Sequence, residues 1–100
     1  MSVHRYSAKR DANEPEIIKA LTQAGASVQK LSDSGVPDLL VGLRGKTFLL
    51  EIKAGRNGLN DVQKTWHNEF WRGEPPIIVR SIGEAFHAVG LLAPDERGED

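Results

Sequence analysis

Two apolar runs separated by a two-residue turn constrain the fold of this chain more than any other feature. The apolar runs lie within residues 38–43 and 46–53, and Arg44-Gly45 lies between them. So short a connection joins antiparallel strands, because parallel strands need a crossover of a dozen or more residues. The sequence therefore predicts an antiparallel hairpin, and the continuous apolar character predicts strands that are mostly covered on both faces.

Three ionisable residues would meet at the open end of this hairpin. Asp38 begins the first strand, and the 13 residues that separate it from Glu51 (51 minus 38) bring the two level. Alternate residues of a strand share a face, so Glu51 and Lys53 point the same way while Ile52 points to the other side. Two carboxylates about 4 Å apart repel by roughly 4 kcal/mol at an effective dielectric of 20, so the pair calls for a cation.

Length and composition limit the classes of protein to consider. One hundred residues form a single domain, and the absence of cysteine excludes disulfides and thiolate-bound zinc. Since no apolar run is long enough to cross a bilayer or to act as a signal peptide, we expect a soluble cytoplasmic protein that does not bind membranes. The net charge is -1, but residues 95–100 contribute -3, so the rest of the chain totals +2. This balance permits nucleic-acid binding without requiring it.

The remaining elements follow from capping patterns and periodicity. Asn13 as N-cap, Pro15 and Glu16 predict a helix that ends at Gly25, and a second capping pattern starts at Asn60. The expected order is a helix (14–24), three strands (26–31, 38–43, 46–53), a helix (60–72), a strand (77–80) and a helix (81–89). We expect a folded domain of residues 14–93 between an arm of residues 1–13 and an acidic, disordered tail of residues 94–100.

On three motifs the chain resembles the VRR-NUC family of the PD-(D/E)XK nuclease superfamily. The motifs are Gly35-Val36-Pro37-Asp38-Leu39-Leu40, Glu51-Ile52-Lys53 and Leu59-Asn60-Asp61-Val62-Gln63-Lys64-Thr65-Trp66. The resemblance extends over about residues 14–89 and is closest to the stand-alone form in viruses and bacteria. It implies an α/β fold with a restriction-endonuclease-like core around a mixed central sheet.

The resemblance also implies roles for individual residues. Asp38 and Glu51 would be metal ligands together with the backbone carbonyl of Ile52, and Lys53 would orient or polarise the attacking water. Glu14 would add a further carboxylate, and Gln63 would reach the same cluster. Hard oxygen ligands without cysteine or clustered histidine favour Mg²⁺ or Mn²⁺.

The resulting expectation is a Mg²⁺- or Mn²⁺-dependent DNA endonuclease. The resemblance points to branched substrates such as four-way junctions, and two opposed nicks would require a two-fold homodimer. Candidate interface residues are Trp71, Phe86, Leu91 and Leu92. One alternative is a catalytically inactive module of the same fold that binds DNA or serves assembly. Another is a nuclease that trims ends or nicks single strands, which the residues do not distinguish.

Several candidate residues also have a purely structural interpretation. Glu14 would stabilise the positive end of its helix, and Gln63 would only cap the helix that Asn60 opens. Val62, Trp66 and Phe70 fit a hydrophobic core better than a base-stacking platform. His4, His67 and His87 lack metal-ligand spacing and are expected to be solvated or hydrogen-bonded. Basic residues that would contact DNA phosphates are Arg5, Lys9 and Arg10 in the arm and Arg44, Lys46, Arg56 and Lys64 close to the proposed site.

Overall fold

The structure, a computed structural model, describes residues 11–94 and contains one four-stranded sheet. The strands β1 (Ser27–Lys30), β2 (Leu39–Leu43), β3 (Lys46–Ile52) and β4 (Ile77–Val79) lie in that order across it. β1, β2 and β3 are antiparallel, whereas β4 pairs with β3 in parallel, so the sheet is mixed. The helices are α2 (Glu14–Gln23), α3 (Asp61–Thr65), which continues into the π-helical turn η1 (Trp66–Phe70), and α4 (Ile82–Ala88). The predicted α/β order of elements is confirmed.

The hairpin of β2 and β3 has the predicted turn. Arg44 and Gly45 both have positive φ angles, 53° and 79°, which suit the right-handed twist of two strands joined by two residues. Leu39 pairs with Leu50, so Asp38 stands opposite Glu51 one step further along the same register. The hairpin therefore brings the two acidic residues level.

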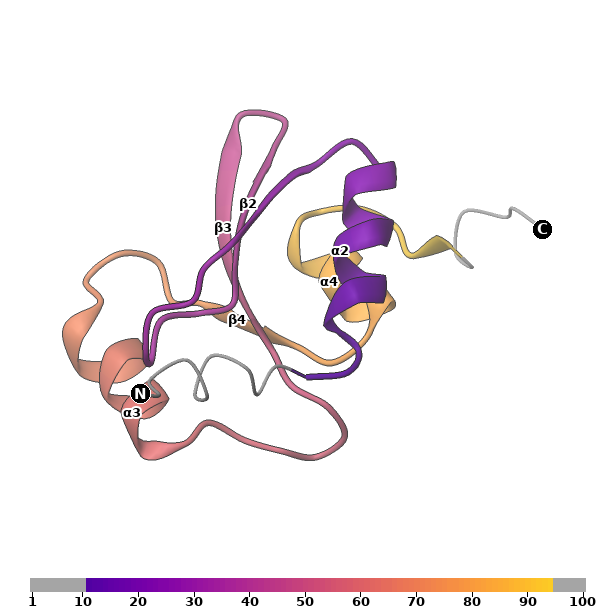
Figure 1. Ribbon diagram of the computed structural model, residues 1–100. Coiled ribbons are helices and arrows are strands. Elements are labelled where there is room, and N and C mark those ends of the chain that lie inside the picture. The colour runs from indigo at the N-terminus through magenta and orange to yellow at the C-terminus, as the bar shows by residue number, and fades with distance from the viewer. Residues whose placement is uncertain (1–10, 95–100) are drawn as a thin grey trace.

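One face of the sheet carries the hydrophobic core. Helices α2 and α4 lie side by side against it, and α3 lies on the other side of the sheet (Figure 1). Because paired residues of neighbouring strands share a face, the register gathers alternate strand residues under the two helices. The fully or nearly fully buried members from strands and helices are Ile17, Leu21, Leu39, Val41, Leu50, Ile52, Val79, Ala85 and Phe86.

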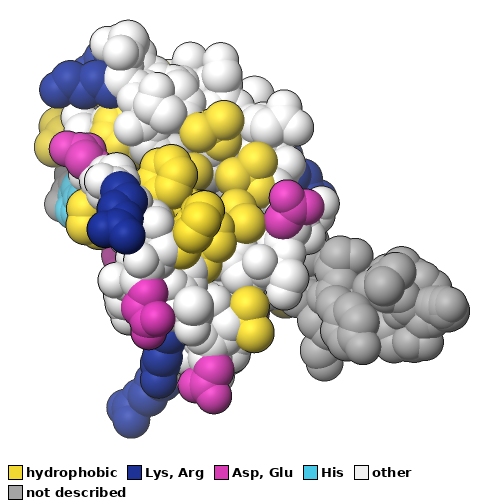
Figure 2. Space-filling view, turned by 90° about the vertical axis from the view of Figure 1, so that its left-hand side faces the viewer, with side chains coloured by type: hydrophobic (Ala, Val, Ile, Leu, Met, Phe, Trp, Pro, Cys, Tyr) yellow, Lys and Arg dark blue, Asp and Glu magenta, His cyan; other side chains and the backbone are white. Residues whose placement is uncertain are grey.

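The opposite face of the sheet is only partly covered, so the predicted covering of both faces is wrong. Leu40 is 38% exposed and Ile78 is 36% exposed. Figure 2 shows the molecule from the side on which α3 lies, with apolar side chains gathered across the middle of that surface. A single short helix does not span a four-stranded sheet, so part of this face stays in solvent.

Helix α2 begins at Glu14, as predicted, but Asn13 does not cap it. The Asn13 side chain makes no capping hydrogen bond, and its backbone is already helical. Its Nδ2 instead donates to the carbonyls of Lys53 at 3.2 Å and Arg80 at 3.1 Å. Asn13 therefore fastens the start of α2 to the ends of two strands.

The second helix ends at Phe70 rather than at Arg72. In η1 the Trp71 amide donates to the Trp66 carbonyl at 3.0 Å, and Trp71 itself has an extended backbone. The Trp71 indole stacks on Trp66 with centroids 4.9 Å apart and donates to the Glu74 carbonyl at 2.9 Å. These contacts turn the chain out of the helix.

This helix also contradicts part of the predicted core. Val62 is 54% exposed and Phe70 is 64% exposed, while Trp66 is half-buried. The helix packs through its polar side, since Gln63 and His67 face the sheet. Gly35 fixes the start of the helix, because a Cβ there would lie 2.9 Å from Cγ1 of Val62.

Two of the four candidate interface residues are in the core. Phe86, on α4, is 2% exposed and Leu91, which follows that helix, is 7% exposed; both belong to the core, so neither is available to a partner. Trp71 and Leu92 are exposed, at 39% and 60%. Within residues 11–94, no helix combines the length and apolar character needed to span a membrane. The predicted arm, apart from residues 11–13, and residues 95–100 of the tail lie outside the described residues.

Candidate functional site

Asp38 and Glu51 lie next to each other at the open end of the hairpin. Oδ2 of Asp38 accepts a hydrogen bond from the Ile52 amide at 2.7 Å, which fixes the Asp38 carboxylate against β3. Glu51 is 1% exposed. Burial, then a hydrogen bond with Asp38 and repulsion from it, raises the pKa of Glu51 to about 9. The pair therefore holds a proton between two carboxylates at neutral pH.

Lys53 reaches the same cluster through Gln63. Its Nζ donates to Oε1 of Gln63 at 2.8 Å, and Nε2 of Gln63 donates to Oε2 of Glu51 at 3.2 Å. Oε1 of Gln63 also accepts from the Asn60 amide at 2.9 Å, which completes the predicted capping box. The predicted capping by Gln63 is confirmed, and the same amide joins the lysine to the glutamate, while a role of Gln63 in catalysis stays a prediction.

His67 belongs to the same cluster of side chains, although it is not among the predicted site residues. Its Nε2 lies 3.0 Å from Oε1 of Glu51, and its side chain is 5% exposed. Burial, and then the positive charge of Lys53, lower the pKa of His67 from its ordinary value, and both favour the neutral imidazole. Helical spacing could have revealed it, since His67 follows Gln63 by four residues and so shares its face.

Two further acidic residues lie near the start of α2. Glu14 is 3% exposed. The charge of Asp11 contributes to raising the pKa of Glu51, although burial contributes most. In the described part of the chain, no three His, Cys, Asp or Glu residues form a group that could hold a metal ion. The roles of Glu14 and of the Ile52 carbonyl as metal ligands stay predictions.

The basic residues expected near the site are not all there. Arg44 and Lys46 form the turn at the closed end of the hairpin, about 17 Å from Glu51 along an extended strand, so their predicted proximity is wrong. Lys64 follows Gln63 on α3, and Arg56 lies in the loop that Arg80 holds by donating to two of its carbonyls. All four are exposed, and their contact with DNA stays a prediction. Arg5, Lys9 and Arg10 lie outside the described residues.

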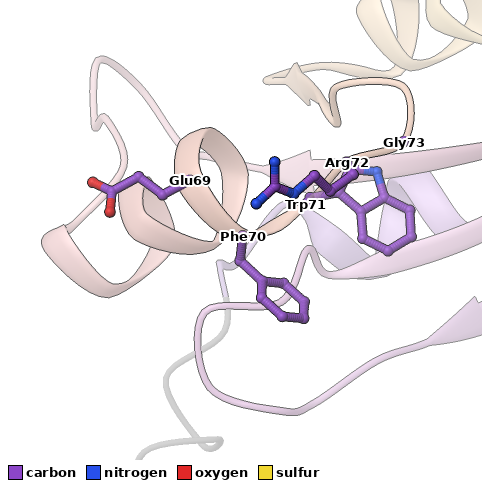
Figure 3. A pocket seen from close by; sticks show the side chains of 5 residues that line it. All are labelled: Glu69, Phe70, Trp71, Arg72 and Gly73. Carbon is purple, nitrogen blue, oxygen red and sulfur yellow. The ribbon is translucent and has the colours of Figure 1, made fainter.

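A hollow lies at the far end of η1. Its lining consists of Glu69, Phe70, Trp71, Arg72 and Gly73. Figure 3 shows Glu69 pointing away from the rings of Phe70 and Trp71. A Cβ at Gly73 would lie 2.8 Å from the Trp71 indole, so only glycine lets the backbone cross this ring. The hollow is therefore lined by two aromatic rings and an arginine.

The donor set of the cluster suits a hard divalent cation. Two adjacent carboxylates repel each other unless they share a proton or bind a cation. Without a cation, the raised pKa of Glu51 means that a proton takes this role. Oxygen ligands with no cysteine fit Mg²⁺ or Mn²⁺, which bind through one or two carboxylates and keep several waters. Asp38 and Glu51 thus fit the group that the sequence predicts.

The chain was compared with protein-family models, curated proteins and solved structures. No protein-family model, no curated protein and no solved structure matches the chain.

Proposed function

We propose that this protein is a metal-dependent nuclease that hydrolyses phosphodiester bonds with Asp38, Glu51 and Lys53. The observation that carries the proposal is the convergence of the three side chains. Burial and the Asp38 carboxylate together raise the pKa of Glu51. The Lys53 ammonium is linked to Glu51 by two hydrogen bonds, both made by the Gln63 amide. Burying like charges is costly, and a site that binds a cation is a physical reason to retain them.

The residues divide the chemistry between them. In hydrolysis a water oxygen bonds to phosphorus while one ester P–O bond breaks. When bound by Asp38, Glu51 and the Ile52 carbonyl, Mg²⁺ or Mn²⁺ would lower the pKa of that water and offset the charge that develops on the phosphate. Lys53 would supply a second positive charge near the carboxylates, since its ammonium donates to Gln63, whose amide in turn donates to Glu51.

The substrate in this proposal is DNA. The hollow at the far end of η1 offers the exposed ring of Phe70 together with Arg72, a combination that suits stacking against unpaired bases. Unpaired or splayed bases occur in branched DNA, which is also the substrate that the sequence resemblance implies. Lys64 and Arg56, both exposed, would contact phosphates.

A homodimer belongs to the same proposal, because two opposed nicks need two sites. Trp71 and Leu92 remain available as interface residues. Light scattering on the purified protein at assay concentration tests this part. We expect a mass of two chains, and a strict monomer would contradict the proposed homodimer.

The function is tested by cleavage of labelled DNA. Duplex, flap, four-way-junction and single-stranded substrates are incubated with Mg²⁺, Mn²⁺ or chelator and with wild type, Asp38→Asn or Lys53→Met. Asparagine keeps an oxygen for the Ile52 amide, so the contact that fixes β3 survives. We expect metal-dependent cutting that both variants lose, with branched DNA cut fastest.

Matched controls are available outside the site. Asp33→Asn lies in the loop before Asp38, and Lys30→Met lies on β1; both residues are exposed. Equal cutting by wild type and by the two site variants would indicate a contaminating nuclease and refute the proposal. Binding of DNA without any cutting would support the inactive DNA-binding module instead.

A further inference from the structure

His67 makes a direct contact with the proposed ligand Glu51. Its Nε2 is 3.0 Å from Oε1 of Glu51, while Nε2 of Gln63 is 3.2 Å from Oε2. Each oxygen of the carboxylate therefore has a nitrogen partner from the same helical segment. The side chains of His67 and Glu51 are 5% and 1% exposed, so water does not replace these contacts.

The helical segment holds the imidazole in place. His67 is the second residue of η1, four residues after Gln63, so both side chains project from one side of the helix. The Trp66 ring lies edge-on to the imidazole, with centroids 6.0 Å apart and planes at 73°. Trp71 in turn stacks on Trp66, so the aromatic side chains that follow α3 brace the histidine.

A carboxylate that binds a metal needs partners of this kind. Its terminal torsion is broad, so an unsupported glutamate samples many orientations. Hydrogen-bond donors behind metal ligands select one orientation, and their loss typically costs 10–100-fold in metal affinity. On Glu51, Gln63 and His67 occupy the two positions from which such donors act.

We propose that His67 is a positioning residue that donates Nε2–H to Glu51 and holds its carboxylate in the orientation that binds a divalent cation. The inference rests on the proposed metal-dependent hydrolysis, because it assigns a role toward that metal. Its effect differs from simple packing. A residue that only fills space would alter stability, whereas a positioning residue alters cation affinity at unchanged stability.

The test is calorimetric titration of the metal-free protein with Mn²⁺, together with its melting temperature in chelator. His67→Leu keeps the volume but has no donor, and His67→Gln replaces Nε2–H with an amide N–H of similar reach. We expect His67→Leu to bind Mn²⁺ about 10–100-fold more weakly than wild type. His67→Gln should recover most of that loss, and His87→Leu on α4 should bind like wild type.

The outcomes separate the two proposals. Wild type that binds no Mn²⁺ overturns the proposed function and this inference with it. Wild type that binds, with His67→Leu binding equally well, overturns the inference alone. If His67→Leu does not fold, His67→Asn, whose amide is too short to reach Glu51, is compared with His67→Gln. Equal Mn²⁺ affinity of those two variants would also overturn it.

Discussion

The two faces of strand β3 differ in what covers them and in what they carry. Leu50 and Ile52 point to the face that α2 and α4 cover, and both are almost fully buried among aliphatic side chains. Glu51 between them points to the other face, where α3 and η1 contribute Gln63 and His67. One strand therefore serves stability on one side and the proposed chemistry on the other.

Burial has opposite energetic effects on the two faces of β3. Burying a leucine stabilises the fold by roughly 1.5–3 kcal/mol, whereas burying a carboxylate costs free energy unless it is paired. Glu51 is as buried as Leu50, and its partners are the Asp38 carboxyl, the Gln63 amide and the His67 imidazole, with the charge of Lys53 nearby. Burial of Glu51 on the polar face therefore stabilises the fold less than burial of Leu50 on the other face.

Glu51→Gln should have the largest effect on function. We expect hydrolysis to fall about 1,000-fold or more, because a metal ion contributes several kcal/mol to transition-state stabilisation and this variant loses a ligand. Cleavage rates with saturating Mg²⁺ measure the loss, and Glu16→Gln on the exposed side of α2 is the matched control. If Glu51→Gln kept more than a tenth of the wild-type activity, Glu51 would not be needed for hydrolysis, and the polar face would have no special role in the chemistry.

Leu50→Ala should have the largest effect on stability. Leu50 is fully buried in the core, so the free energy of unfolding should fall by about 2–5 kcal/mol. Urea denaturation measures the change. Leu40→Ala, on the other face, is the control and should lose clearly less, since Leu40 is 38% exposed. Equal losses would mean that the two faces contribute alike to the core.

The stability of the metal-free protein should depend on pH through Glu51. Its pKa is raised from 4.5 to about 9 on folding, so the folded state holds a proton that the unfolded state has released between these values. This contribution is fully present below pH 4.5 and declines as the pH rises through 9. Urea denaturation in chelator between pH 5 and 9 should show the decline in wild type and a flatter profile in Glu51→Gln. Parallel profiles would contradict the shared proton.

Phe70→Ala should have the smallest effect on stability and a moderate effect on substrate binding. Phe70 is 64% exposed, so the free energy of unfolding should change by less than about 0.5 kcal/mol. Loss of one stacked base should weaken binding of single-stranded DNA by about 1–3 kcal/mol. Fluorescence anisotropy with Asp38→Asn as the background prevents cleavage during the measurement. Unchanged affinity would remove the stacking role of the hollow.

The proximity of Asp38, Glu51 and Lys53 was predictable because its determinants are local. The turn at Arg44-Gly45 sets the register, the register places Asp38 opposite Glu51, and strand alternation places Lys53 beside them. Gln63 was also predictable, since it follows a recognisable capping residue. These contacts depend on short stretches of chain with known geometry.

The remaining features depend on contacts between distant segments. Asn13 looked like a helix cap, but its partners are 40 and 67 residues away in the sequence. The amphipathic pattern of Val62, Trp66 and Phe70 suggested a core, yet the helix turns its polar side to Glu51. An apolar stripe shows that a helix is amphipathic. Which side packs against the sheet depends on tertiary contacts, here those of Gln63 and His67 with Glu51.

The proposed function depends on the binding of a divalent cation by Asp38 and Glu51 on the polar face of β3. Crystals soaked in Mn²⁺ and measured at the manganese absorption edge test it most directly. We expect an anomalous peak between the two carboxylates in wild-type crystals and no such peak in Glu51→Gln crystals. A peak elsewhere, or no peak at saturating Mn²⁺, would contradict it.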